Sequence, residues 1–416
     1  SKNLYSEVDT FKDWAPKHNL KGNDTGIDLV AQTRNSNEYH AIQCKFYHAD
    51  YTLSKKDIDS FGFAASSTDF SHRILICTTD KFTKNLKENL KKQPNFTIID
   101  LTALERSEID FLSFVECHNL EIFAKKIPRD HQKEAIKAAL EHFEKADRGQ
   151  LLMACGTGKT FTSLRIAEGY ADKGKKVLFL VPSLALMNQT ITEWTQQSMY
   201  KLHCYAVCSD SDVGKNISLN EDKIELSLTD LQYPATTNAA ALYEAMSKNQ
   251  NSDIMQVVFC TYHSIDVVHQ AQQSGIGAFD LIICDEAHRT TGQAFNDEKQ
   301  ADISCFVRIH DNDYIKGNKR LYMTATPRLF TEESIAKTTN KDITLYSMDN
   351  KNLYGEVFYT LPFAAAVKKG LLTDYKVIVL ELSAKNVESS LVNLKQFEDK
   401  SLNISDATKI IGCWKA

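Results

Sequence analysis

The chain has 416 residues, of which 43% are hydrophobic and 25% are charged, and its formal net charge is −5 at pH 7. These fractions are typical of folded globular proteins and exclude a disordered chain. The length allows two or three domains. The negative balance gives no overall basic field, so contact with nucleic acid would depend on local surfaces.

Residues 1–120 are predicted to form a first α/β domain. Apolar residues at helical spacing indicate a helix over residues 1–20. The turn-forming sequence KGNDTG follows, and then IDLVAQT and YHAIQCKFY, which read as the two strands of a hairpin. Ser54, with Asp57 three residues later, marks the start of a helix. Alternating strands and helices complete the domain.

Three polar residues of the hairpin suggest a nuclease site. Gln43 and Lys45 are two residues apart on one strand, so their side chains project to the same face. Asp28 starts the neighbouring strand, and the pairing of the hairpin brings it beside them. A metal-dependent nuclease needs an acidic metal ligand, a second oxygen ligand and a nearby lysine. Asp28 and Gln43 are therefore the candidate ligands of Mg²⁺ and Lys45 the candidate catalytic lysine; a plain α/β hairpin is the alternative.

Residues 121–340 are predicted to form a second domain built on a parallel sheet. Long aliphatic strands alternate with helices, as expected for strands that are buried on both faces. Residues 211–252 are polar and irregular, and we interpret them as an insertion, either a solvated spacer, which we favour, or a DNA-contacting loop. Residues 341–416 are predicted to start a third α/β unit.

The sequence MACGTGKT, residues 153–160, lies between a strand and a helix, which is the setting of a phosphate-binding loop. Met153 replaces the first glycine of the common pattern. Lys159 would neutralise the β- and γ-phosphates, and Thr160 would hold Mg²⁺. The candidate ATP-binding residues of the loop are Gly156, Thr157, Gly158, Lys159 and Thr160.

A second nucleotide motif, LIICDEAH, covers residues 281–288. Its strand delivers Asp285 and Glu286 to the carboxyl edge of the sheet, where ligands bind in open α/β folds. Asp285 is the candidate Mg²⁺ ligand, and Glu286 is the candidate catalytic residue that polarises the attacking water. His288 would connect the γ-phosphate to the rest of the protein.

With these motifs, residues 125–330 resemble the first motor domain of superfamily-two helicases and translocases. LVPSLALMNQ (180–189) and TYHS (261–264) are similar to segments that touch the nucleic-acid backbone in that family. IPRDHQKEAI resembles its adenine-reading segment, which implies ATP-binding roles for Arg129 and Gln132. MTATPR resembles the element that links hydrolysis to movement, which implies coupling roles for Thr324 and Thr326.

The resemblance implies ATP hydrolysis coupled to movement along nucleic acid, with phosphate contacts dominating the binding. Motors of this family have a second RecA-like domain that supplies an arginine finger, and residues 341–416 are too few to form one. We therefore expect a piece of a longer polypeptide that binds ATP better than it hydrolyses it.

The front domain, with its G-x-D-x-G-I-D turn and Q-x-K strand, resembles Mrr-like nucleases of the PD-(D/E)xK fold, in which Gln replaces the usual acid. Asp24 and Glu7 are further candidates for this site, Glu7 from the first helix. Gln43 is neutral, so the site carries one negative charge fewer than an ordinary member of the fold.

The order of nuclease and DEAH motor resembles type ISP restriction-modification enzymes. That resemblance implies ATP, Mg²⁺ and double-stranded DNA, with a second motor domain, a methyltransferase and a target-recognition domain elsewhere in the longer polypeptide. A repair or recombination helicase-nuclease, and a motor whose degenerate front domain only grips DNA, are the alternatives. No signal peptide or membrane-length apolar run is visible, and the cysteines lie scattered, so we expect a cytoplasmic prokaryotic protein.

Overall fold

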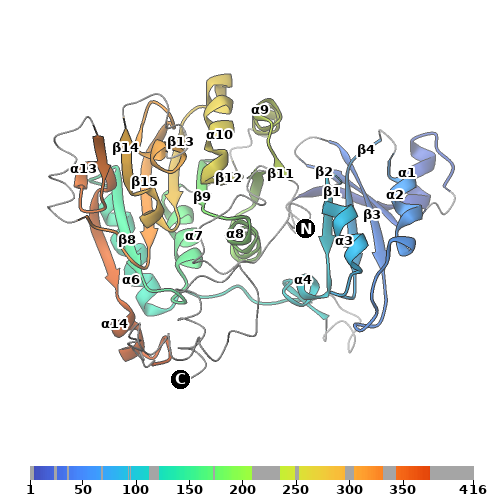
Figure 1. Cartoon of the computed structure of the whole chain (residues 1–416), viewed down its shortest axis with the longest axis horizontal. Helices are drawn as coiled ribbons and strands as arrows, with labels where there is room; N and C mark the ends of the chain where they lie inside the picture. Colours follow the sequence, from blue (N-terminus) through green and yellow to red (C-terminus); the bar gives the residue numbers. More distant parts are fainter. Residues whose placement is uncertain are drawn as a thin grey trace, which may run out of the picture. The chain divides into compact units, whose positions relative to one another are not determined.

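The computed structural model describes residues 4–22, 26–34, 37–66, 69–91, 93, 95–111, 121–171, 174–208, 235–248, 253–295, 304–330 and 343–374. Residues 1–366 form one compact unit, and residues 367–416 form another. The first unit contains a five-stranded sheet and an eight-stranded sheet (Figure 1). Asp24 lies outside the described residues.

The five-stranded front sheet has the order β1-β2-β3-β4-β5. Strands β1, β2 and β3 are antiparallel, whereas β4 and β5 run parallel to β3. The elements up to residue 122 are β1 (Tyr5–Thr10), α1 (Phe11–Lys17), β2 (Leu29–Thr33), β3 (Tyr39–Lys45), η1 (Lys55–Asp57), α2 (Asp59–Ala64), β4 (Phe70–Cys77), α3 (Lys84–Lys91), β5 (Phe96–Ile99), α4 (Leu101–Glu105), β6 (Ile109–Asp110) and β7 (Glu121–Ile122).

The predicted hairpin is confirmed, but the helix predicted over residues 1–20 is wrong in its first half. Residues 5–10 form strand β1, which pairs with β2, and the helix starts only at Phe11. Thr10 caps that helix by accepting a hydrogen bond from the Asp13 N–H at 3.2 Å. Helical spacing of apolar residues did not reveal the strand because its partner, β2, lies about twenty residues further along the chain. The predicted cap at Ser54 is present as a capping box with Asp57.

The eight-stranded sheet is parallel throughout, with the order β11-β10-β12-β9-β13-β15-β8-β17. Its elements and connections are α6 (Asp130–Phe143), β8 (Arg148–Met153), α7 (Lys159–Tyr170), β9 (Lys176–Val181), α8 (Leu184–Gln197), β10 (Leu202–Val207), β11 (Ala235–Thr236), α9 (Ala239–Lys248), β12 (Met255–Thr261), η4 (Tyr262–Ser264), α10 (Ile265–Ala271), η5 (Gln272–Ile276), β13 (Phe279–Cys284), η6 (Ala287–Thr290), β14 (Gly292–Phe295), α11 (Ser304–Val307), η7 (Arg308–His310), β15 (Gly317–Thr324), β16 (Ile343–Tyr346), α13 (Lys351–Tyr354), β17 (Glu356–Leu361) and α14 (Phe363–Lys368).

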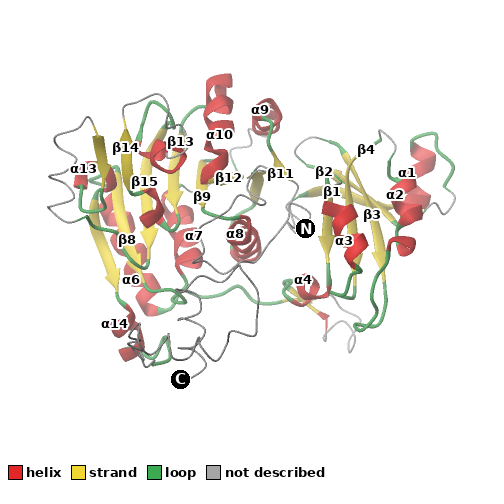
Figure 2. Cartoon of the chain, viewed as in Figure 1, coloured by secondary structure: helices red, strands yellow, loops and turns green. Residues whose placement is uncertain are grey.

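Helices cover both faces of this sheet (Figure 2). On one face, Trp194 of α8 packs edge-on against Phe179 of β9 and Phe259 of β12. The alternate strand residues, such as Leu178 and Val258, belong to the core on the other face, with residues of α9 and α10. The strands are buried on both sides, which explains why their sequences are continuously aliphatic.

Two predictions about the later chain need correction. Strand β17 pairs with β8 instead of starting another sheet, so residues 356–361 extend the first motor sheet. The described part of the 211–252 insertion is not a solvated spacer. It contains β11 and α9, and α9 buries Leu242 and Met246 in the core.

Two buried histidines face each other in the front sheet. His40 of β3 and His72 of β4 are paired across the strands, and their ring centroids are 5.1 Å apart. Tyr5 hydrogen-bonds to His40 at 3.0 Å, and Thr97 to His72 at 2.9 Å. Burial lowers the pKa of His40 to about 4 and that of His72 to about 3. Both rings are therefore neutral in the folded protein at pH 7.

This pair predicts that the front domain loses stability as the pH falls from 6.5 towards 4. The unfolded chain takes up protons near the ordinary histidine pKa, whereas the folded chain does not, so protonation favours unfolding. The expected loss at pH 5.5 is about 1 kcal/mol for each histidine. His72→Gln keeps a hydrogen-bonding group beside Thr97 but cannot titrate, so its stability should fall less between pH 7 and pH 5.5.

The measurement is urea unfolding at both pH values, followed by Trp14 fluorescence in a background without the other two tryptophans. His48→Gln is the control, because the side chain of His48 is 83% exposed. Equal pH dependence in wild type and His72→Gln would contradict the prediction.

Candidate active sites

The phosphate loop joins β8 to α7 through two glycines in left-handed conformations. The φ angles are 80° at Gly156 and 85° at Gly158, where other residues are strained. A Cβ atom on Gly158 would also lie 2.5 Å from Gln132 Nε2. Met153, which replaces the first glycine of the common pattern, is the last residue of β8 and is fully buried. A strand position does not need glycine, so the loop keeps its shape despite this departure.

The predicted adenine-reading segment lies against this loop. Gln132 donates from Nε2 to the Thr157 carbonyl at 3.3 Å, and His131 also hydrogen-bonds to that carbonyl, at 3.0 Å. The Arg129 N–H donates to Gln132 Oε1 at 2.9 Å. The backbone of Arg129 and the side chain of Gln132 are thus both brought to the loop. Trp194, which the sequence did not single out, donates to the Thr160 carbonyl at 3.2 Å.

The acidic motif follows β13 at the same carboxyl edge of the sheet. Burial, and secondly the neighbouring charge of Glu286, raise the pKa of Asp285 to about 6, although Lys159 acts in the opposite direction. Lys159 therefore lies close enough to Asp285 for their charges to interact. Tyr262 donates to the Asp285 carbonyl at 2.8 Å. Glu286 has a left-handed backbone, with φ 47° and ψ 49°, which is strained for a residue with a side chain.

The structure brings the DEAH motif and the predicted coupling element together. The Nδ1 atom of His288 is 2.9 Å from Thr324 Oγ1 and 3.4 Å from Glu286 Oε2. The Thr326 N–H donates to the same Thr324 hydroxyl at 3.2 Å. A continuous series of contacts thus runs from Glu286 through His288 and Thr324 to Thr326.

The front sheet brings the three predicted nuclease residues to one face. Leu29 pairs with Ile42, so Asp28, one residue earlier, lies opposite Gln43. The alternation of β3 places Lys45 on that same face, which also carries Ala41 and its core neighbours. The Cys44 N–H donates to Asp28 Oδ2 at 2.7 Å, which fixes the carboxylate beside β3.

These residues fit a divalent cation. Gln43 is only 3% exposed, and its Oε1 atom has no hydrogen-bond partner among the described residues. An unpartnered buried oxygen is costly unless something binds it. A cation beside Asp28 would satisfy that oxygen, and carboxylate and amide oxygens are ordinary ligands of Mg²⁺. No group of three or more histidine, cysteine or acidic side chains forms a metal site in the described parts of the chain.

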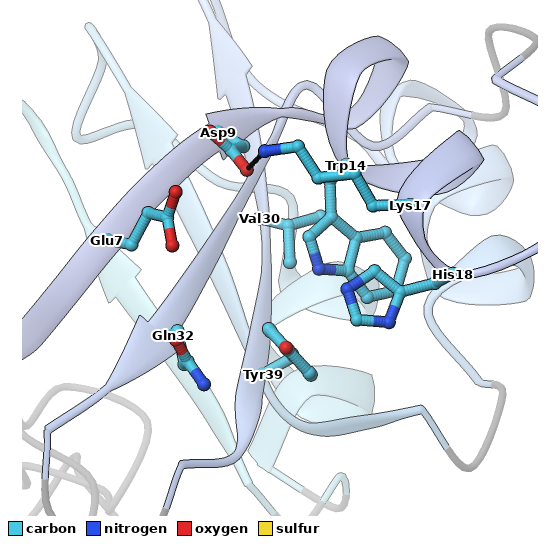
Figure 3. Close-up of a pocket in the computed structure, with 8 residues that line it drawn as sticks. All are labelled: Glu7, Asp9, Trp14, Lys17, His18, Val30, Gln32 and Tyr39. Atoms are coloured by element: carbon cyan, nitrogen blue, oxygen red, sulfur yellow. Dashed lines mark hydrogen bonds and ion pairs between the residues drawn. The ribbon is translucent and has the colours of Figure 1, made fainter.

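Glu7, the further candidate for the nuclease site, is placed elsewhere. It lies on β1 opposite Gln32, not on a helix, and so four residues along β2 from Asp28. There it lines a small pocket of about 50 Å³ together with Asp9, Trp14, Lys17, His18, Val30, Gln32 and Tyr39 (Figure 3). Asp9 forms an ion pair with Lys17 in this pocket at 2.7 Å. Glu7 therefore does not join Asp28 and Gln43.

Asp57 is a residue near Lys45 that the sequence identified only as part of a helix cap. Its carboxylate accepts hydrogen bonds from the Ser54 N–H and hydroxyl, both at 2.7 Å, and from the Tyr51 hydroxyl at 3.0 Å. Burial acts to raise the pKa of Asp57, but these bonds and the nearby charge of Lys45 lower it overall. The capping box thus holds a carboxylate in the electrostatic neighbourhood of Lys45.

Comparisons with known proteins match both domains of the chain to restriction enzymes. Residues 1–121 match a family model described as a restriction endonuclease, of the Mrr type, and residues 125–329 match one described as the res subunit of type III restriction enzymes. The whole chain superposes on part of the ATP-dependent type ISP restriction-modification enzyme LlaBIII, solved bound to DNA, with 35% identity and a TM-score of 0.77. Over its whole length the chain is similar to part of a type ISP enzyme. The expected resemblance and the α/β fold class, a nuclease domain followed by a RecA-type domain, are confirmed.

LlaBIII and two further similar proteins are all much longer than this chain. The match covers 26% of LlaBIII. A "Probable helicase" of African swine fever virus is 28% identical over 249 residues, which are 60% of this chain and 24% of the viral protein. The type I restriction enzyme EcoAI endonuclease subunit of Escherichia coli is 24% identical over 305 residues, which are 69% of this chain and 30% of that subunit. The chain thus spans about a quarter to a third of their lengths.

None of its described helices has the length and apolar character needed to span a membrane.

The contact between His288 and Thr324 predicts that Thr324→Val uncouples hydrolysis from nucleic acid. Valine keeps the shape of threonine but removes the hydroxyl that joins His288 to Thr326. We expect DNA-stimulated ATP hydrolysis to fall at least about tenfold in this variant while the Kd for ATP stays within about twofold. Thr360→Val, at an exposed position of β17, is the control. Undiminished stimulation by DNA in Thr324→Val would contradict this coupling role.

Proposed function

We propose that this chain carries the nuclease and the first motor domain of an ATP-dependent DNA translocase-endonuclease of a restriction-modification system. The observation that carries the proposal is the presence of two separate constellations in one chain, the phosphate and acidic loops on one sheet and Asp28, Gln43 and Lys45 on the other. The match to a type ISP enzyme bound to DNA over the full length of this chain supports the same conclusion. The substrate is duplex DNA, cleaved after ATP-driven translocation.

In the motor, each side chain has a separate task. The loop N–H groups and Lys159 would bind the phosphates of ATP, and Thr160 and Asp285 would hold Mg²⁺. Glu286 would orient the attacking water and accept its proton. His288 would transmit the presence or loss of the γ-phosphate to Thr324 and Thr326, which lie at the end of β15 and just after it. Gln132 and Arg129 would bind at the adenine end of the nucleotide.

In the nuclease, Asp28 and Gln43 would hold Mg²⁺ and Lys45 would stabilise the charge that develops on the scissile phosphate. The metal ion, when bound, supplies a Lewis acid and a water of lowered pKa. Asp57 would keep the ammonium of Lys45 in place through its charge. Because Asp28 is the one carboxylate assigned to the metal among the residues that the structure describes, we expect weak metal binding that DNA phosphates complete.

We propose that a second motor domain supplies an arginine to the bound ATP, and that methyltransferase and target-recognition domains choose the DNA site. The chain by itself would then bind ATP but hydrolyse it slowly. Rapid, DNA-stimulated turnover by residues 1–416 alone would contradict this.

Replacing Asp28 or Lys45 tests the nuclease assignment. Asp28→Ala and Lys45→Ala in the complete polypeptide should lower plasmid cleavage at least about a hundredfold, because each removes a group at the scissile phosphate. ATP binding should be unchanged. Asp59→Ala and Lys84→Ala, which alter exposed residues of α2 and α3, are the matched controls. Full cleavage by either site variant would refute the assignment.

The motor assignment is tested with the same plasmid assay, with and without ATP, on methylated and unmethylated DNA. Lys159→Ala should abolish ATP binding and, with it, ATP-dependent cleavage, while the isolated metal site stays intact. Cleavage that needs no ATP in the wild type would refute the coupling of nuclease to motor. Equal cleavage of methylated and unmethylated DNA would instead favour a repair enzyme.

A further inference from the structure

One continuous segment contacts both halves of the candidate nucleotide site. Strand β16 pairs with β14, which follows the DEAH motif, and Gly292 is opposite Tyr346. Strand β17 then pairs with β8, and Leu361 is opposite Met153 at the entrance to the phosphate loop. The first loop residue after β8, Ala154, donates its N–H to the Leu361 carbonyl at 3.0 Å. We call residues 343–361 the strap.

Within the strap, Tyr354 is joined directly to the end of the DEAH motif. Its side chain is fully buried, and its hydroxyl is 2.9 Å from the Thr290 carbonyl and 3.0 Å from Thr290 Oγ1. Thr290 Oγ1 donates its own hydrogen to the Ala287 carbonyl at 2.8 Å. A carbonyl only accepts, so the Tyr354 hydroxyl donates its single proton to the Thr290 carbonyl and ties the strap to the turn that follows His288.

His310 binds the same carbonyl from the other side. A carbonyl only accepts, so the Nε2 atom of His310, 3.2 Å from the Thr290 carbonyl, must carry the proton. Its Nδ1 then accepts from the Tyr322 hydroxyl at 3.0 Å. Burial lowers the pKa of His310 to about 3, in keeping with this neutral form. The Thr290 carbonyl is thus held by two buried donors.

Strand β8 holds the strap from the phosphate-loop side. Arg148 donates to the Leu353 carbonyl at 2.8 Å, and Gln150 Nε2 donates to the carbonyls of Met348 and Gly355 at 2.9 and 3.0 Å. These bonds fix the backbone on both sides of α13. The contact is close, because a Cβ on Gly355 would lie 2.1 Å from the Arg148 carbonyl.

The contact between Arg148 and the strap has a high free-energy cost for a contact that only stabilises the fold. Arg148 is 8% exposed, and its hydrogen bonds go to carbonyls, an amide and a hydroxyl. No ion pair joins it to a carboxylate among the residues that the structure describes. A buried cation without a counter-charge is destabilising relative to an apolar residue of similar size. An apolar residue in place of Arg148 would pack as well, but it would form no hydrogen bonds that fix the position of the strap.

We propose that the strap is a coupling element of the motor, and that Tyr354 is a positioning residue that sets the acidic loop relative to the phosphate loop. The inference rests on the proposed ATPase and deepens it. Because β8 and the DEAH turn are both held by one segment, displacement of the strap would shift the turn that follows His288 relative to the phosphate loop. The strap continues through α14 into residues 367–416, so the following chain is covalently linked to this element.

The test is Tyr354→Phe in the complete polypeptide. Phenylalanine keeps the ring packing and removes only the hydroxyl that binds Thr290. The kcat of DNA-stimulated ATP hydrolysis should fall at least about fivefold, while the Kd for ATP stays within about twofold and the Tm is nearly unchanged. Tyr359→Phe is the matched control, because that hydroxyl lies in the same strap but reaches only Glu134, at 3.4 Å.

The outcomes distinguish failure of the coupling role of the strap from failure of the proposed function. If the wild type hydrolyses ATP and Tyr354→Phe is equally active, the coupling role of the strap is refuted and the proposed function is unaffected. Loss of kcat only in proportion to a loss of folded protein also refutes the coupling role, since that is what a merely structural role predicts. A wild type without ATP hydrolysis refutes the proposed function, and the strap with it.

Discussion

Three parallel strands, β8, β15 and β13, fix the distance across the nucleotide site. The phosphate loop follows β8 and the acidic loop follows β13, and the single strand between them is β15. Strands lie about 4.8 Å apart, so the two loops start roughly 10 Å from each other. That gap suits a triphosphate with its metal ion, and Thr324, the last residue of β15, lies between the two loops. The site is therefore a consequence of strand order more than of any single contact.

The front sheet follows a related constraint on a smaller scale. Its three candidate residues meet because β2 and β3 are antiparallel and because side chains alternate along β3. A shift of one residue in this pairing would move Asp28 to the opposite face from Gln43 and Lys45. The Asp28–Cys44 hydrogen bond opposes such a shift, because it locks a side chain of one strand to the backbone of the other. Register and site are thus maintained by the same contact.

The sequence predicted those features of the molecule that depend on residues close together in the chain. The phosphate loop, the DEAH strand end and the Gln43–Lys45 pair depend on neighbours within a few residues, and the structure brings each group together as predicted. Strand β1 was missed because its apolar spacing also fits a helix and only pairing with β2 distinguishes the two. Strand β17 was assigned to another unit because its partner, β8, lies about two hundred residues earlier. The Tyr354–Thr290 contact has no sequence signal, because it joins two segments through one hydroxyl.

The left-handed backbone of Glu286 has a consequence for how this protein changes under selection. Glycine or asparagine adopts that conformation more readily, so Glu286→Gly or Glu286→Asn would relieve strain of about 1 kcal/mol or more. Either replacement also removes the carboxylate that we assign to the attacking water. Selection for thermal tolerance and selection for turnover therefore act in opposite directions at this one position. Glutamate would persist there only while ATP hydrolysis is under selection.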